Sequence, residues 1–381
     1  MVAVDRGDEV SAYLGKLRLQ AFRNYSDSLV SFEPGLSVLL GRNGQGKSNV
    51  LEAVCYLALL RSFRTHTIGV LRQWGADSFV VEGEIGSTEA DPLAIHRLEV
   101  SYGERRTLAL DGNLVDRASE FINQFQCVPL VPEDIDLVRG PARERRRFLD
   151  ILCTQTRPAY LGHLQSFHLA IRSRNAILRA SDTYPEHALA AYDELVVAHG
   201  TALEVVRGEL VGELNRQLAA VGERLFVDGG GKIVAKYSSF WEGQPIAAEV
   251  EAAFRESLDK SRIRDTREMR TCVGPHLANV NIHLAGRPLA RYGSEGECRM
   301  SAIALRLASL GVIRGVVTPE RAVVLLVDDV FGELDSQRRR ALFECVAEAD
   351  QVLITATELP EELPRDGLHM YQVESGSIES L

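Results

Sequence analysis

The sequence predicts an α/β fold with a mixed, largely parallel sheet that is split by an inserted, mainly helical lobe. The first of three observations behind this prediction is a glycine-rich loop, Gly41–Ser48, between an apolar run and a stretch that forms a helix without a breaker. The second is a pair of mainly apolar runs, Val323–Val327 and Gln351–Thr355, which alternate with helical segments as the buried strands of a parallel sheet do. The third is the region of residues 144–225, where strand patterns nearly vanish and helical periodicity takes over.

The N-terminal part is predicted to be rich in strands, with one helix directly behind the glycine-rich loop. Strands are indicated by alternating apolar and polar residues or by short apolar runs. Two of them are expected to pair and to end in a turn at Asp111-Gly112-Asn113, since such residues favour tight turns. The predicted elements are, in order, strands at Leu17–Phe22 and Leu36–Leu40, a helix at Asn49–Leu60, and strands at Phe79–Ile85, His96–Tyr102 and Arg106–Leu110.

The helical region contains a long amphipathic stretch that begins near Pro185. It extends for roughly 40 residues, or ~60 Å at the helical rise. His199 and Glu213 fall in or beside its apolar seam, so its heptads are imperfect and a packed helical lobe is favoured over a free coiled coil. After this region, Val280–Leu284 is predicted as a strand and the residues from Gly296 to about Ile313 as a helix.

Composition limits the classes of protein that the chain can belong to. Its 381 residues are 45% hydrophobic and 25% charged, which is ordinary for a soluble globular protein. No apolar stretch approaches the length of a membrane span, and Met1–Arg6 lacks the layout of a signal peptide, so we expect a cytoplasmic protein with no membrane partner. The net charge of −10 argues against a uniformly basic nucleic-acid binder, although clustered arginines allow a local basic patch.

The loop Gly41–Ser48 matches the phosphate-binding P-loop pattern in the setting that its mechanism requires. Its glycines let backbone N–H groups converge on phosphate oxygens at the start of a helix. Lys47 is predicted to reach the β- and γ-phosphates, and Ser48 to hold Mg²⁺ through its hydroxyl. A glycine-rich turn that merely caps a helix is the alternative, which a strict match in this context disfavours. The predicted nucleoside triphosphate site consists of Gly41, Arg42, Asn43, Gly44, Gln45, Gly46, Lys47, Ser48 and Asn49.

The apolar run Val323–Val327 leads directly into Asp328 and Asp329, which is a Walker B pattern with two adjacent carboxylates. Asp328 is predicted to coordinate Mg²⁺ directly or through water, and Asp329 to orient and activate a water at the γ-phosphate. Gly332–Asp335 follows and looks like a D-loop of ABC-type ATPases, which adds Asp335 to the predicted catalytic residues. The strand that ends at Thr355 places a polar residue where the switch residue of ABC ATPases lies.

Upstream, Tyr292–Glu297 precedes a helix at the position of an ABC signature motif. The Ser294 hydroxyl and the helix N-terminus suit a γ-phosphate. In ABC ATPases this motif covers the nucleotide that the other subunit holds, so we expect a homodimer on ATP binding. Taken singly, Ser294 and Glu297 are an N-cap with the features of a capping box, and the order of the motifs favours the functional interpretation.

Taken together, these motifs resemble those of the RecF family of DNA replication and repair proteins, which are ABC-type, SMC-like ATPases without the long coiled coil. The resemblance spans nearly the whole chain, and the order of the motifs is as informative as any one of them. It is carried by Leu17–Tyr25, Ser48–Ala53, Arg61–Thr65, Pro132–Asp134, Arg145–Asp150, Gly274–His276 and Val327–Asp335.

The resemblance implies an ATP-dependent DNA-binding protein that acts in DNA repair, recombination and replication. Its implied roles are gap recognition, recombinase loading and the SOS response, with ATP as the cofactor and slow, switch-like hydrolysis. The implied partners are single-stranded/duplex junctions or linear duplex DNA, together with RecR and RecO. It also places Arg61 and Arg64 near the DNA-facing side of the head. We therefore expect an ATPase head in residues 1–135 and 271–381, split by a helical lobe in residues 136–270.

The chain departs from the family pattern at a few positions. Leu277-Ala278-Asn279 follows the Gly-Pro-His motif, where the family usually has Arg-Asp-Asp. Glu297 and Cys298 stand in the signature where the family has Gln and a polar residue, and Arg42 occupies a P-loop position that is more often small or acidic. The P-loop and Walker B are intact, so these departures concern DNA or partner contacts and engagement of the nucleotide across a dimer.

Three other classes compete with this interpretation. A transporter-type ABC subunit is compatible with the helical lobe, but Arg23-Asn24-Tyr25 and the pair Asp328-Asp329 instead of Asp-Glu favour the RecF family. An SMC-like structural ATPase needs arms far longer than this lobe. An ATP-dependent nuclease of the overcoming-lysogenization-defect type needs an extra acidic metal domain, for which no residues remain.

Overall fold

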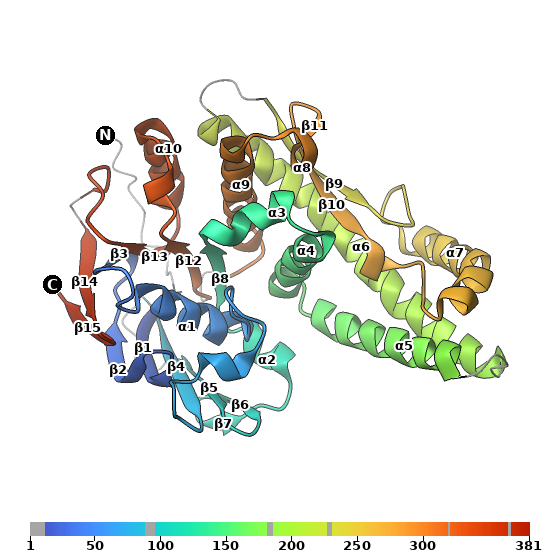
Figure 1. The fold of residues 1–381 in the computed structure, drawn as a ribbon, viewed down its shortest axis with the longest axis horizontal. Coiled ribbons are helices and arrows are strands. Elements are labelled where there is room, and N and C mark those ends of the chain that lie inside the picture. The colour runs from blue at the N-terminus through green and yellow to red at the C-terminus, as the bar shows by residue number, and fades with distance from the viewer. Residues whose placement is uncertain (1–11, 88–95, 181–185, 227–230, 319–320, 365–366) are drawn as a thin grey trace. The chain divides into compact units, whose positions relative to one another are not determined.

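The computed structural model describes residues 12–87, 96–180, 186–226, 231–318, 321–364 and 367–381 (Figure 1). The chain forms two compact units. The first comprises residues 1–133 and 309–381, and the second comprises residues 134–308. The first predicted division, at 135/136, lies close to one of these boundaries, and the second, at 270/271, falls within the second unit.

One sheet of the first unit is antiparallel and has the strand order β2-β1-β4-β5-β6-β7. In β1, a register shift between Leu14 and Lys16 lets Leu14 and Leu17 both point into the core, although they are three residues apart. The predicted turn after β6 is confirmed, with left-handed backbone at Asp111 and Gly112. The strands are β1 (Ala12–Phe22), β2 (Tyr25–Ser31), β4 (Phe79–Ser87), β5 (His96–Tyr102), β6 (Arg106–Leu110) and β7 (Asn113–Leu114).

The second sheet of this unit has the order β15-β14-β3-β13-β12-β8, and its strands are parallel except for β15. Every residue of β8, β12 and β13 is buried, which explains why β12 and β13 read as mainly apolar runs rather than as alternating patterns. Strand β8 was not predicted from the sequence. The C-terminal pair β14 and β15 was not predicted from the sequence. The strands are β3 (Gly35–Leu40), β8 (Gln126–Leu130), β12 (Val323–Asp328), β13 (Gln351–Ala356), β14 (Leu368–Glu374) and β15 (Ser377–Ser380).

Helix α1 (Lys47–Leu59) contacts strands of both sheets and lies between them (Figure 1). It is buried from Val50 to Leu59, so apart from Glu52 this stretch is made of mainly apolar residues on all sides and is not amphipathic. It approaches β4 so closely that a Cβ on Gly83 would meet Leu57 Cδ2 at 2.4 Å. The other helices of this unit are η1 (Ile68–Leu71), α2 (Ala118–Ile122), η5 (Phe331–Glu333), α10 (Ser336–Val346) and the last turns of α9 (Glu295–Arg314).

The second unit is built on α6 (Glu186–Leu225), a helix of 40 residues that packs against α5 (Tyr160–Ala180), α7 (Ala247–Glu268) and β9 (Ile233–Ser238). The prediction of a packed helical lobe is thereby confirmed. No described helix of the chain is both long enough and apolar enough to cross a membrane. The remaining elements are η3 (Pro132–Ile135), α3 (Asp136–Arg139), α4 (Ala142–Thr156), η4 (Pro275–Leu277), β10 (Asn279–Leu284), β11 (Arg287–Pro288), α8 (Leu289–Tyr292) and most of α9.

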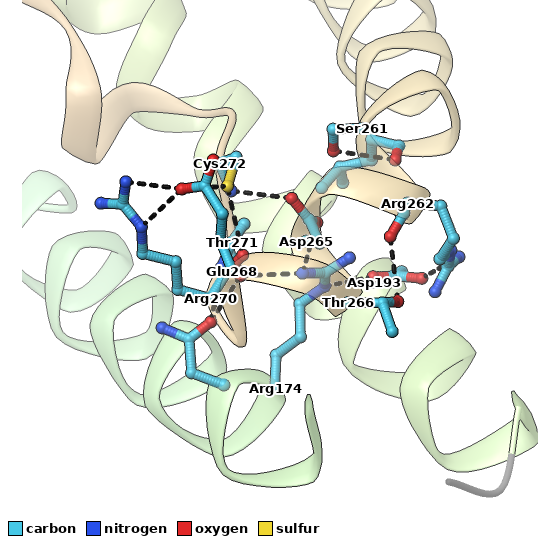
Figure 2. A network of polar contacts seen from close by, with 12 residues as sticks. Arg174, Asp193, Ser261, Arg262, Asp265, Thr266, Glu268, Arg270, Thr271 and Cys272 are labelled. Atoms are coloured by element: carbon cyan, nitrogen blue, oxygen red, sulfur yellow. Dashed lines mark hydrogen bonds and ion pairs between the residues drawn. The ribbon is translucent and has the colours of Figure 1, made fainter. Parts of the chain in front are cut away.

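A buried ionic network fixes the ends of α5, α6 and α7 against one another (Figure 2). Arg174 on α5 lies 2.6 Å from Asp193 on α6 and 2.8 Å from Asp265 on α7. Arg262 binds the second oxygen of Asp193 at 2.7 Å. Arg174 and Asp265 are fully buried, and removing Arg174 would leave the Asp265 carboxylate without its ion-pair partner in the core.

The Gly-Pro-His motif lies next to this network within the second unit. The Pro275 carbonyl accepts a hydrogen bond of 2.6 Å from the buried Arg207, which also binds Asp150 at 2.7 Å. Two of the three residues that follow the motif are held by α4, since Arg145 donates to Asn279 and Arg146 to the Ala278 carbonyl. Ala278 is buried, whereas the Leu277 side chain is exposed.

Candidate nucleotide-binding site

The P-loop connects β3 to α1, as predicted. Gly46 is the N-cap of α1 with φ 117°, and Gly44 has φ 81°, so both lie in the left-handed region that favours glycine. A Cβ on Gly41 would meet the Val373 carbonyl oxygen at 2.3 Å, because β14 runs directly beside the loop. The three glycines of the motif are thus required by backbone conformation and by close approach.

The loop presents unpaired hydrogen-bond donors at the start of α1. Among the residues that the structure describes, the backbone N–H groups of Gly46, Lys47 and Ser48 have no acceptor. The Lys47 ammonium folds over the loop and donates to the carbonyls of Gly41 at 2.6 Å and Arg42 at 3.1 Å. Burial lowers the pKa of Lys47, and the charges of Asp329 and Asp328 act in the opposite direction. Donors of this kind at a helix N-terminus suit phosphate oxygens.

Asp328 is the point at which three segments of the chain meet. The hydroxyls of Ser48 and Thr355 both donate to its Oδ1 atom at 2.7 Å. Within the described part of the chain, its Oδ2 atom has no partner. A hydroxyl and a carboxylate are hard oxygen donors, and two such protein ligands, completed by phosphate and water, fit the coordination that Mg²⁺ prefers. The predicted metal ligands Ser48 and Asp328 are therefore brought together.

Asp329 follows directly but has a different environment. Its backbone is left-handed, with φ 48°, and its N–H donates to Thr355 Oγ1 at 3.1 Å. The side chain is exposed, whereas Asp328 is buried. A non-glycine residue in this conformation is uncommon and marks a site where the surroundings fix the backbone. Asp329 is thus accessible to water, and its charge acts on Lys47.

Two hairpins support the P-loop, and sequence patterns alone did not identify this role. At the turn between β1 and β2, Asn24 Nδ2 donates to the Gln45 carbonyl at 2.9 Å and the Tyr25 hydroxyl donates to the Gly46 carbonyl at 3.0 Å. At the turn between β14 and β15, the Ser375 N–H donates to Gln45 Oε1 at 2.7 Å. The only sequence signal was Arg23-Asn24-Tyr25 as part of the family resemblance.

A polar chain links α1 to the segment that follows it. Arg64 donates to Asn49 Oδ1 at 2.8 Å, and Asn49 donates to Asn24 Oδ1 at 2.8 Å. Arg64 also lies 3.7 Å from the fully buried carboxylate of Glu52, which Arg23 holds at 2.7 Å. Asn49 and Arg64 are thus directly connected beside the P-loop.

Arg61 differs from its neighbour Arg64. Its side chain is exposed and has no partner among the described residues. Arg64 is partly engaged by α1, so of the two predicted DNA-binding residues Arg61 is the freer cation.

The two remaining predicted site residues are helix caps. Ser294 and Glu297 form the capping box of α9, since the Ser294 N–H donates to Glu297 at 2.7 Å and the Glu297 N–H donates to the Ser294 hydroxyl at 3.2 Å. Hydrogen bonds from the backbone N–H and the side chain of Ser294 to the Glu297 carboxylate lower the pKa of Glu297. Asp335 caps α10 by accepting from the Arg338 N–H at 2.9 Å. Asp335 lies in the first unit with the P-loop but forms no hydrogen bond or ion pair with it among the described residues, whereas Ser294 belongs to the second unit.

The chain is similar to known proteins over nearly its whole length. A family model described as the RecF/RecN/SMC N terminal domain matches residues 13–375. The chain is 33% identical to the DNA replication and repair protein RecF of Symbiobacterium thermophilum, over 96% of this chain and 98% of that protein. It is 34% identical to RecF of Acidothermus cellulolyticus, over 92% of this chain and 95% of that protein.

Solved structures give the same result. The chain matches a structure of the recombination mediator protein RecF-ATP in the RecFOR pathway with a TM-score of 0.87 and 26% identity, over 97% of this chain and 98% of that one. A likeness to an SMC head, bound to the C-winged helix domain of ScpA, has a TM-score of 0.53 at 14% identity and concerns the fold alone. The predicted fold, an ABC-type ATPase head with an inserted helical lobe, is confirmed, and the chain belongs to the RecF family of DNA replication and repair proteins.

Proposed function

We propose that the chain is an ATP-dependent DNA-binding protein that acts in DNA repair, recombination and replication. The single observation that carries the proposal is the convergence of Ser48 and Thr355 on Asp328 beside a P-loop with free N–H donors. This is the arrangement of a nucleotide-dependent switch, because one carboxylate connects the phosphate-binding loop to two strands of the parallel sheet. Family membership selects DNA repair among the processes that such a switch can drive.

ATP is the proposed nucleotide and Mg²⁺ the proposed metal. Residues 41–49 would cradle the phosphates, with Lys47 leaving the Gly41 and Arg42 carbonyls to contact the β- and γ-phosphates. Ser48 and Asp328 would hold the metal, which neutralises charge on the phosphate oxygens when it is bound. The solved relative that is described as RecF-ATP supports the choice of nucleotide.

Hydrolysis is proposed to be slow and to act as a timer. Asp329 would orient a water for attack on the γ-phosphate, which its exposure and its place after β12 allow. Ser294 would contact the nucleotide of a second copy, so that ATP drives formation of a homodimer, and Asp335 would contribute at the same interface. Ser294 is exposed at the N-terminus of a 20-residue helix, which supports such a contact.

DNA is the proposed macromolecular partner, through a surface that includes Arg61 and Arg64. We further propose a cytoplasmic protein that recognises single-stranded/duplex junctions and works with RecO and RecR in recombinase loading and the SOS response. The support is family membership and a solved relative described within the RecFOR pathway.

The experiment that tests the proposal is a fluorescence anisotropy measurement of DNA binding with and without ATP. Single-stranded, blunt duplex and gapped substrates of equal length are compared at the same salt concentration, since affinities at different salt are not comparable. We expect ATP with Mg²⁺ to strengthen binding, with a preference for gapped DNA. Binding that is independent of ATP on all substrates would contradict the proposal.

A further inference from the structure

Trp74 is the most exposed large hydrophobic residue of the described chain. Its exposure is 101%, whereas the next most exposed large apolar residue, Ile263, reaches 85%. A Trp side chain covers about 150–250 Å² of contact area and is usually highly buried. Trp74 therefore offers an aromatic surface that no described part of its own chain uses.

The backbone that carries Trp74 is rigid. The Ala76 N–H donates to the Gln73 carbonyl at 3.0 Å, and Gly75 has φ 86°, so residues 73–76 form a β-turn with glycine at its third position. Trp74 is the second residue of this turn and stands at its corner. An exposed side chain on a fixed turn is pre-organised for a partner, because little backbone entropy is lost on binding.

Three hydrogen bonds join this turn and the residues before it to the hairpin between β1 and β2. The Gln73 N–H donates to the Ala21 carbonyl at 2.7 Å, and Gln73 Nε2 donates to Ser26 Oγ at 2.9 Å. The Arg23 N–H donates to the Leu71 carbonyl at 2.7 Å. Since Asn24 and Tyr25 of the same hairpin hold the P-loop, the turn that presents Trp74 is mechanically connected to the nucleotide site.

The segment that leads to Trp74 is cationic in an otherwise acidic chain. It contains Arg61, Arg64 and Arg72, against a single acid in residues 61–78, Asp77, while the whole chain has a net charge of −10. The Arg72 guanidinium is held by the carbonyls of Gly69 and Asp77 and has no carboxylate partner among the described residues. A positive segment next to an unused aromatic surface matches the way proteins bind unpaired nucleic acid, by phosphate attraction and base stacking.

We propose that Trp74 is a stacking platform for an unpaired DNA base, so that it recognises the single-stranded part of a gapped or junction substrate. The inference rests on the proposed DNA binding and adds to it the residue that distinguishes unpaired from paired DNA. A base inside a duplex is already stacked on both faces, whereas an unpaired base offers its π-face to the indole. An apolar groove of a partner protein is the alternative occupant, and the isolated position of Trp74 in a chain segment with an excess of arginines favours the base.

The chain allows a direct spectroscopic test, because it contains only two tryptophans, Trp74 and Trp241. Trp241 lies in the second unit and donates to the carbonyl of nearby Gln244 at 2.9 Å. Trp241→Phe therefore leaves Trp74 as the only indole. In this background, tryptophan emission and the anisotropy of labelled DNA are measured in the same titration with single-stranded, gapped and blunt duplex DNA, with and without ATP.

We expect single-stranded and gapped DNA to quench Trp74 emission, with a titration curve that coincides with the curve of DNA anisotropy. Blunt duplex should bind without quenching Trp74. Trp74→Ala should weaken binding to gapped and single-stranded DNA by about 5- to 150-fold, the range measured for loss of one stacked base. Trp74→Phe should retain most of the affinity. Leu114→Ala, which removes another exposed apolar side chain of the same unit, is the matched control and should change nothing.

Five results would overturn the inference. Binding of single-stranded or gapped DNA without a change in Trp74 emission would show that Trp74 does not stack on a base, while leaving the proposed function intact. If Trp74→Ala weakens binding to blunt duplex as much as binding to gapped and single-stranded DNA, Trp74 does not select unpaired bases. If ATP alone quenches Trp74 emission, and the quenching grows with protein concentration, Trp74 lies in a contact between two copies of the chain. If Trp74 emission is quenched only when a partner protein is added, Trp74 contacts that protein and not a base. A chain that binds none of the DNAs refutes the proposed function as well.

Discussion

Ser48 Oγ lies 2.7 Å from Asp328 Oδ1, although the two residues are 280 positions apart in the sequence. The contact joins the start of α1 to the end of β12 within the first unit. Thr355, at the end of the neighbouring strand β13, donates to the same oxygen. A change in the position of Asp328 would therefore affect both the P-loop and the strand ends, which is the physical basis of the proposed nucleotide-dependent switch.

Lys47→Ala should weaken ATP binding by roughly 10- to 100-fold and leave the fold intact. The physical reason is that charged hydrogen bonds contribute about 1.5–3 kcal/mol, while Lys47 contacts only loop carbonyls and supports no core side chain. Binding of a fluorescent ATP analogue and thermal unfolding by circular dichroism measure the two effects. Lys16→Ala, which removes an exposed lysine of the same unit, is the control. Wild-type affinity and turnover in the mutant would show that the P-loop assignment is wrong.

Asp329→Asn should leave nucleotide binding nearly unchanged and slow hydrolysis by about 10²- to 10⁴-fold, since an amide cannot act as a base toward water. Asp328 still serves the metal in this variant, so the ATP-bound dimer should persist for longer. Phosphate release and light scattering measure these two outcomes. The partner substitution Asp328→Asn should instead weaken Mg²⁺-dependent nucleotide binding. Equal hydrolysis rates for Asp329→Asn and the wild type would contradict the proposed role.

Ser294→Arg should abolish the ATP-dependent dimer without removing ATP binding by the monomer. Because Ser294 also caps α9, loss of the cap by itself is expected to cost about 1 kcal/mol of stability. Ser294→Asp separates the two effects, since Asp is also a good N-cap but its charge repels a γ-phosphate. Light scattering with and without ATP is the measurement. Normal dimerisation of both variants would show that the signature interpretation is mistaken.

The double variant Arg61→Ala, Arg64→Ala should bind DNA more weakly and with a shallower salt dependence, while its ATPase activity remains. Each lost phosphate contact reduces the slope of log K against log salt by about 0.9 for duplex DNA. Arg64 is engaged by Asn49 and lies near Glu52, so the single variant Arg61→Ala should account for most of the change. An unchanged slope would show that these arginines serve the head itself and do not contact DNA.

Stability of the helical lobe should fall with pH below neutrality because of His276. Burial lowers the pKa of His276 to about 4, and its Nε2 atom lies 3.2 Å from the Thr271 carbonyl. The unfolded chain, with a histidine pKa near 6.5, then binds the proton more readily than the folded chain. The contribution of the neutral His276 side chain to the free energy of unfolding is fully present above about pH 6.5. It is lost as the pH falls toward 4, by up to ~1.4 kcal/mol per pH unit.

Denaturant unfolding of the wild type and of His276→Gln at a series of pH values measures this effect. The glutamine side chain keeps a donor for the Thr271 carbonyl and does not titrate, so its stability should depend less on pH in this range. Parallel pH profiles for the two proteins would exclude His276 as the source.

Most helices and buried strands were predictable because their patterns are local. The helix behind the P-loop was predicted at residues 49–60 and begins at Lys47, and the long helix predicted from Pro185 extends from Glu186 to Leu225. Val323–Val327 was predicted as a strand because both faces of β12 are buried. In contrast, β14 and β15 were not predicted, since Leu368–Glu374 mixes half-buried and buried positions without a clear period.

The candidate site was predictable where a single segment carries the chemistry, as in Lys47 and Ser48. Asn24, Tyr25 and Ser375 were not identified as supports of the P-loop, because each acts through a contact with residues far away in the sequence. Trp74 gave no sequence signal at all, since a tryptophan after an apolar helix is usually part of a core.

The sequence by itself determined the family, the order of the nucleotide-binding motifs and the types of residue that would hold phosphate and metal. These depend on spacing within short segments, where chain geometry leaves few alternatives. The tertiary structure alone decided that Ser48 and Thr355 share one oxygen of Asp328, and that Arg64 is engaged while Arg61 and Trp74 are exposed. Contacts and burial of this kind depend on which distant strands and helices pack together, and no local pattern specifies that packing.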